Sequence, residues 1–208
     1  MGFEILIESL VGMFTSPDET FKRASNSEIS LVIPVILLLV IGVLLGAVIM
    51  RELPAKEESL RQSGRTLTHN IEPQIKAEKA KASFFPIFIL LFWVLFNIAF
   101  SIIITKMNGM GEISGIFKCT SLLVYPFFVA ILLKLIVSFV PFLGFLYSLV
   151  MLAVSIWTLF ALWKIAVAVG QLAPMDGAVA AGVPAFFFML FWMSYGLIVD
   201  LFVYRFAG

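Results

Sequence analysis

One ionisable side chain in this sequence lies where a charge is costly. Lys134 is the only charged residue in the apolar stretch YPFFVAILLKLIVSF, residues 125–139. A lysine in such surroundings can pair with a carboxylate, take part in a substrate or proton pathway, or extend its charged end to water. Each of these interpretations requires something outside the stretch to compensate for the charge.

Other residue types that carry enzyme chemistry are sparse. Cys119 is the only cysteine, so an internal disulfide and a thiolate metal cluster are both excluded. Side chains of metal-binding type gather in one polar region: Glu52, Glu57, Glu58, His69 and Glu72. Their spacing matches no metal-ligand pattern, and neither paired aspartates nor a Ser/His set occurs. We therefore expect no enzyme, no metal and no cofactor.

The medium around Lys134 follows from the composition of the chain. Its 208 residues are 62% hydrophobic and 13% charged, with a mean hydropathy of +1.09. A soluble domain of this size could not bury so much apolar surface, so the chain must be embedded in a lipid bilayer. The net charge of +1 gives no reason to expect nucleic acid as a partner.

Long apolar runs predict an all-α, polytopic integral membrane protein rather than a β-barrel. A hydrocarbon core about 30 Å thick needs about 20 apolar residues per helix, whereas a barrel strand shows about ten residues of alternating character. Five segments meet the helical criterion: 31–50, 84–105, 119–139, 142–163 and 179–203. Residues 31–208 are thus expected to form a five-helix transmembrane domain, with a polar loop containing short helical pieces at 51–82.

These spans place Lys134 roughly 7 Å inside the end of the third helix, at about 1.5 Å per residue. Its stem is long enough to bring the amine to the headgroups, which is the simplest interpretation. The third and fifth spans run in the same direction, so Asp200 should lie at a similar depth on the same face. An ion pair between Lys134 and Asp200 is the structural alternative, and a pathway is a third.

Residues 1–30 are expected to form an amphipathic helix followed by a short capped helix. Apolar residues recur at helical spacing near the start: Phe3, Leu6, Ile7, Leu10, Val11 and Phe14. This helix could lie in the membrane interface or pack against the bundle. Next, Ser16 is predicted to cap a helix that begins at Pro17, with Asp18 in the first turn and Arg23 near the end.

Glycines in the first span indicate close helix packing. Gly42 and Gly46 form a GxxxG pair, which lets another helix approach the backbone. The neighbour could be another span of this chain or a second copy, so a homo-oligomer is an open alternative.

Short motifs suggest a family. SPDETFKR precedes the first span, Tyr125-Pro126 and Ile156-Trp157 follow in later spans, and Gly170 comes before a short loop and a small-residue fifth span. In this order the motifs resemble the Yip (Ypt-interacting protein) family, whose eukaryotic members are five-span proteins associated with Rab-type GTPases and membrane shaping. The chain lacks their DLYGP motif and is more similar to prokaryotic members, some of which accompany ABC-type exporters.

The resemblance implies a plasma-membrane accessory or scaffold protein with a cytoplasmic N-terminus. Outside the spans, Lys and Arg residues are slightly more numerous on the membrane face opposite the N-terminus. Because these residues are enriched on the cytoplasmic side, their count favours the opposite orientation. The expected partners are the lipid bilayer and another membrane protein complex, such as an exporter. A small transporter or channel subunit is the alternative, and it requires a watery cavity lined by the polar residues of the spans: Asn97, Ser101, Ser155 and Thr158.

Overall fold

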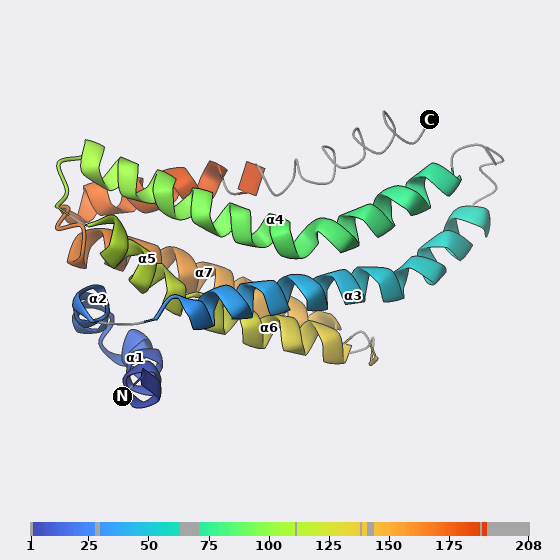
Figure 1. The fold of residues 1–208 in the computed structure, drawn as a ribbon, viewed down its shortest axis with the longest axis horizontal. Coiled ribbons are helices and arrows are strands. Elements are labelled where there is room, and N and C mark those ends of the chain that lie inside the picture. The colour runs from blue at the N-terminus through green and yellow to red at the C-terminus, as the bar shows by residue number, and fades with distance from the viewer. Residues whose placement is uncertain are drawn as a thin grey trace.

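The computed structural model describes residues 2–27, 30–62, 71–110, 112–137, 139–140, 144–187 and 189–190, and all regular structure in them is helical. The helices are α1 (Gly2–Thr15), α2 (Pro17–Asn26), α3 (Val32–Gln62), α4 (Ile71–Lys106), α5 (Ile113–Leu122), α6 (Val124–Val137) and α7 (Gly144–Ala168). A further helical segment covers residues 174–187. The prediction of an all-α protein is therefore confirmed (Figure 1).

Within the described residues, four helical stretches are long and apolar enough to cross a membrane: Val32–Ala55, Ile75–Lys106, Ile113–Val137 and Gly144–Ala168. They coincide with the first four predicted spans. The fifth predicted span, 179–203, begins within the helical segment 174–187, and most of it lies outside the described residues. A total of five spans therefore stays a prediction.

The third span is broken where α5 gives way to α6. Pro126 has no backbone N–H to donate, and its ring would collide with the carbonyl of Leu122, four residues earlier, in a continuous helix. α5 accordingly ends at Leu122. The N–H of Leu123 donates instead to the carbonyl of Thr120 at 3.0 Å, as in a 3₁₀ turn.

The region 51–82 differs from the predicted polar loop. α3 continues to Gln62 and α4 already begins at Ile71, so helix occupies most of the region. Leu53, Ala77 and Ala82 remain buried there while Arg51 and Lys79 are exposed. These buried residues form an apolar stripe along helices that are otherwise charged. Such a stripe is enough for α3 and α4 to continue as helices beyond their long apolar runs.

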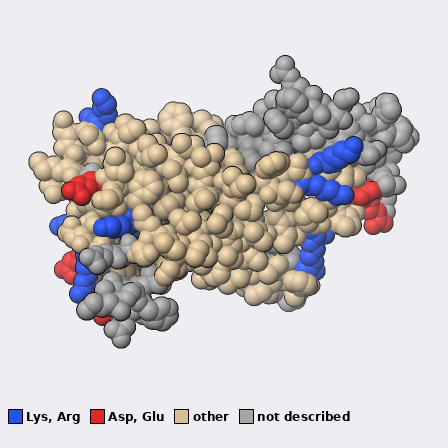
Figure 2. Space-filling model, in the orientation of Figure 1, with Lys and Arg blue, Asp and Glu red and all other residues tan. Residues whose placement is uncertain are grey.

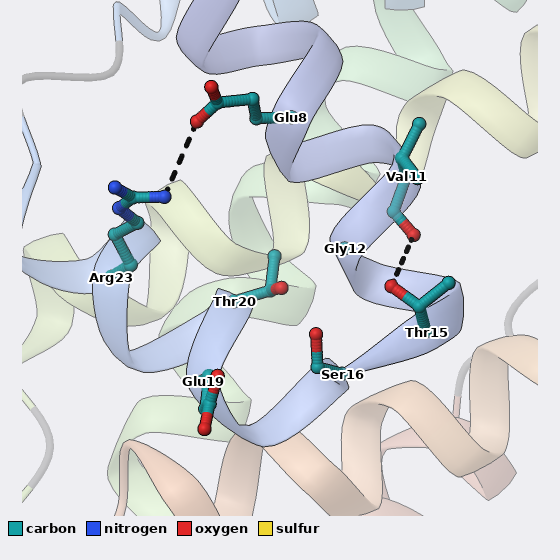
Figure 3. A pocket seen from close by; sticks show the side chains of 8 residues that line it. All are labelled: Glu8, Val11, Gly12, Thr15, Ser16, Glu19, Thr20 and Arg23. Carbon is teal, nitrogen blue, oxygen red and sulfur yellow. Dashed lines mark hydrogen bonds and ion pairs between the residues drawn. The ribbon is translucent and has the colours of Figure 1, made fainter.

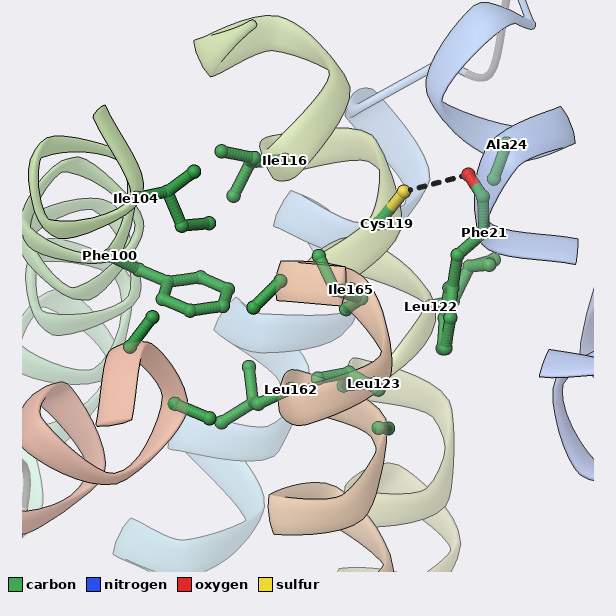
Figure 4. Close-up of a cluster of buried hydrophobic side chains, with 14 of the residues drawn as sticks. Phe21, Ala24, Phe100, Ile104, Ile116, Cys119, Leu122, Leu123, Leu162 and Ile165 are labelled. Carbon is green, nitrogen blue, oxygen red and sulfur yellow. Dashed lines mark hydrogen bonds between the residues drawn. The ribbon is translucent and has the colours of Figure 1, made fainter. Parts of the chain in front are cut away.

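Most of the buried core lies at one end of the bundle. Phe100 and Ile104 of α4 meet Ile116 and Leu122 of α5 and Ile165 of α7, all fully buried (Figure 4). A second cluster joins α3 to α6 further along the bundle: Leu38, Ile41, Val124 and Ile131.

The helices α1 and α2 form an N-terminal hairpin beside the end of the bundle that holds most of the core (Figure 1). As predicted, α2 has proline at its start, Asp18 in its first turn and Arg23 in its last. Ser16 occupies the N-cap position, but the prediction that its side chain caps α2 is wrong. Its N–H donates to the carbonyl of Gly12 at 2.7 Å, because the backbone there still follows the last turn of α1.

Candidate functional site

The N-terminal hairpin packs against the bundle through segments that carry the short family motifs. SPDETFKR lies at the start of α2, and Ile156-Trp157 lies in α7. Phe21 and Ala24, on one face of α2, are buried against α5 and α7. The thiol of Cys119 donates to the carbonyl of Phe21 at 3.1 Å (Figure 4). Gly115 allows this approach, because a Cβ there would lie only 3.1 Å from the Cβ of Ser25.

An ion pair links the same helix to α7. The amine of Lys164 lies 3.0 Å from a carboxylate oxygen of Asp18, and its side chain is 21% exposed. The amine also lies 5.0 Å from the ring centroid of Trp163, within cation–π range. From the sequence, Asp18 was placed in the first turn of its own helix and was not linked to Lys164, 146 residues away.

A groove runs between the two helices of the hairpin, with a volume of about 720 Å³ (Figure 3). It is lined by Glu8, Val11, Gly12, Thr15, Ser16, Glu19, Thr20 and Arg23. Arg23 pairs with Glu8 across it at 3.3 Å, and both side chains are largely exposed. The groove therefore combines a screened ion pair with hydroxyl groups and offers no nucleophile–base pair.

Inside the bundle, polar side chains bond to one another. Thr120 of α5 donates to the side-chain oxygen of Asn97 on α4, and the Asn97 amide donates to the carbonyl of Trp93 at 2.8 Å. Asn97 is fully buried, as is Ser101 one turn further along α4. The bond between Thr120 and Asn97 connects two helices in the buried interior, where an unpaired amide would be costly.

Lys134 has a carboxylate neighbour that sequence analysis did not consider. Its amine lies 3.6 Å from a carboxylate oxygen of Glu52 and 5.2 Å from the ring centroid of Tyr147. The predicted partner, Asp200, lies outside the described residues, so that pairing stays a prediction. Glu52 was missed because residue 52 was assigned to a loop, whereas continuing α3 by one turn would have placed it near the end of the span.

The glycine pair of the first span faces α4. A Cβ at Gly42 would collide with the backbone of Pro86, and one at Gly46 would lie 2.5 Å from the carbonyl oxygen of Ala82. Both glycines thus lie at a close contact between two helices of the same chain. Contact with a second copy through this face of α3 would require α4 to move aside.

Metal-binding side chains do not cluster in the described part of the chain, where no group of three or more could hold an ion. Of the five polar residues considered in sequence analysis, Glu52 lies near Lys134, and Glu57 and Glu58 follow on α3. His69 and the side chain of Glu72 lie outside the described residues.

Long apolar helices with their charges at the two ends define an integral membrane protein (Figure 2). A family model, the Yip1 domain, matches residues 11–196, which is most of the sequence. The chain therefore belongs to the Yip family, and the resemblance seen in its short motifs is confirmed. No curated protein and no solved structure matches it.

Proposed function

We propose that the protein is a non-enzymatic accessory or scaffold protein, which organises a membrane or assists a partner complex such as an exporter. The proposal rests on what the polar side chains of the protein bond to and where its charged side chains lie. Asn97 and Thr120 bond to each other within the bundle, and Asp18 pairs with Lys164 to fix α2 against it. The exposed charges remain at the two ends of the molecule, where another protein can reach them (Figure 2).

The exposed side of α2, including its edge of the groove, is the part of the surface that we assign to the partner. Phe21 and Ala24 fix this helix to the bundle, so Glu19, Lys22 and Arg23 are presented by a firmly packed element. A rigid display of charge favours specific recognition, because little side-chain and backbone freedom remains to be lost on binding.

We place the protein in a prokaryotic plasma membrane with its N-terminus in the cytoplasm, as the family resemblance implies. Together with five spans, this arrangement puts Gly208 on the outer face. A reporter fused after Gly208 that is active in the cytoplasm would contradict this orientation.

The alternative is a small transporter or channel subunit. It would need Asn97 and Ser101 to share a watery cavity with Ser155 and Thr158. The first two are buried inside the bundle, whereas Ser155 lies on the exposed side of α7. Ser155 and Thr158 donate to backbone carbonyls of their own helix at 2.7 Å. This arrangement favours the scaffold proposal over a shared polar pathway.

Co-purification from native membranes tests the proposal. The full chain is cross-linked in its cells, extracted in mild detergent and analysed for bound proteins. We expect one membrane complex at a fixed ratio to the chain. The ratio should fall several-fold in Lys22→Glu, because reversing an exposed charge on α2 changes complementarity at the assigned surface.

The matched control is Lys79→Glu, the same charge reversal at an exposed site on α4. Its complex should be recovered as for the unaltered chain. Recovery of the protein alone would contradict the accessory role, and equal losses in both variants would contradict the assignment to α2.

A further inference from the structure

The N-terminal hairpin has an apolar side that the proposed function does not use. Met13 of α1 is buried in the core, whereas Val11 and Phe14 are each 59% exposed. Large apolar side chains exposed together indicate contact with lipid or with another protein. The direction and depth of α1 show which of these covers them.

The axis of α1 lies across the bundle. Figure 1 shows α1 and α2 nearly end-on, while α3, α4 and α6 run along the length of the molecule. Because the long apolar helices cross the bilayer, a helix that runs across them lies along the plane of the membrane. In-plane helices bury an apolar face about 5–10 Å into the boundary between headgroups and acyl chains.

The depth of α1 follows from its contact with α7. The ring of Phe14 lies 4.7 Å from that of Trp157, measured between centroids. Trp157 precedes Lys164 by seven residues, which is roughly 10 Å along a helix. The ion pair of Lys164 with Asp18 marks a polar level, so Phe14 lies below it at a depth suited to acyl chains.

The surface around Phe14 continues the lipid-facing side of a span. Ile156 and Phe160 lie on either side of Trp157 in the sequence of α7. Both side chains are exposed on the outside of the bundle, as expected for residues that contact lipid. On the side toward α2, Glu8 is paired with Arg23. Of the charged side chains on α1, the one that the structure describes, Glu8, is therefore directed to the groove of the hairpin and balanced there.

We propose that α1 is an in-plane membrane helix whose outer face, at Phe14, is covered by the acyl chains of one leaflet. The inference extends the proposed function, because it names lipid rather than the partner complex as the occupant of this face. It also gives the hairpin two sides with separate uses, α1 for the bilayer and α2 for the aqueous surface.

Site-specific quenching tests the inference. A Cys119→Ser background removes the native thiol and keeps a hydroxyl donor for Phe21. Single cysteines at Phe14 and Glu19 are labelled with a nitrobenzoxadiazole dye, and the protein is reconstituted into vesicles of phosphatidylethanolamine and phosphatidylglycerol. Iodide on both sides reports water, and a lipid with a doxyl group on its fifth acyl carbon reports the upper acyl region.

The ratio of lipid quenching to iodide quenching should be at least about threefold higher at position 14 than at the exposed Glu19 of α2. Iodide quenching at position 14 equal to that at position 19 would overturn the inference. So would quenching by neither agent, which would mean that protein covers this face. Circular dichroism and monodisperse elution confirm the fold of each variant. The accessory role is tested separately, by co-purification.

Discussion

At the scale of single residues, the bond between Thr120 and Asn97 joins α4 to α5 inside the bundle. Thr120→Val keeps the shape of the side chain and removes the hydroxyl, which leaves the buried Asn97 oxygen without its donor. We expect the free energy of unfolding in lipid bicelles to fall by about 0.6 kcal/mol, the average for such bonds in membranes, and by no more than about 1.7 kcal/mol. Thr120→Ser, which retains the hydroxyl, should lose less. Equal losses in both variants would assign the effect to the missing methyl group or to packing.

The ion pair of Asp18 with Lys164 should contribute less, because Asp18 is half exposed and water screens the interaction. Asp18→Asn should increase hydrogen exchange in α2 by a factor corresponding to about 0.2–1 kcal/mol. The double exchange Asp18→Lys with Lys164→Asp should restore much of the protection that either single reversal removes. Additive losses in that double variant would contradict a direct pair.

The sequence alone did not predict which residues the charged side chains pair with. The apolar stretch correctly drew attention to Lys134, but its neighbour Glu52 depended on how far α3 continues. Asp18 and Lys164 are far apart in the chain, and each had an adequate local explanation. Pairings between distant residues follow from packing, which periodicity alone does not determine.

At the scale of helices, α3 and α4 meet at Gly46. Gly46→Ala would place a Cβ 2.5 Å from the Ala82 carbonyl oxygen, so α4 must move outward. Overpacking of this kind costs about 1–3 kcal/mol. We expect a lower midpoint of thermal unfolding in detergent, with the oligomeric state unchanged.

The matched control is Gly182→Ala, in the helical segment 174–187. A Cβ there would have no described atom within 4 Å, so the higher helix propensity of alanine should leave stability unchanged or raised. A shift in oligomeric state for Gly46→Ala alone would favour contact between copies over packing within the chain.

Hydropathy predicted where the first four spans lie, because burial in lipid requires long apolar runs. It could not predict where helices stop. The charges of 51–82 concealed the stripe that includes Leu53 and Ala77, and Pro126 divides an otherwise continuous apolar run into α5 and α6. The ends of these helices depend on local stereochemistry, as at Pro126, and on small residues that face a neighbouring helix, as at Gly46 and Ala82.

At the scale of the whole molecule, the protein is a bundle of long apolar helices, and we propose that it acts on a partner through its ends. Inside it, the bond between Thr120 and Asn97 holds two helices together, and the charged residues of the described part gather at the two ends (Figure 2). A transporter of the same length would use those interior residues differently, because a transported solute must meet them in water. Access of water to the middle of α4 therefore separates the two functions.

Cysteine accessibility measures that access directly. Ser101→Cys in the Cys119→Ser background changes little in shape at a fully buried site, and Glu19→Cys provides an exposed reference on α2. In vesicles with a membrane-impermeant maleimide on both sides, we predict labelling at position 101 at least about tenfold slower than at position 19. Labelling of both positions at similar rates would show a water-filled path into the bundle and contradict the scaffold account.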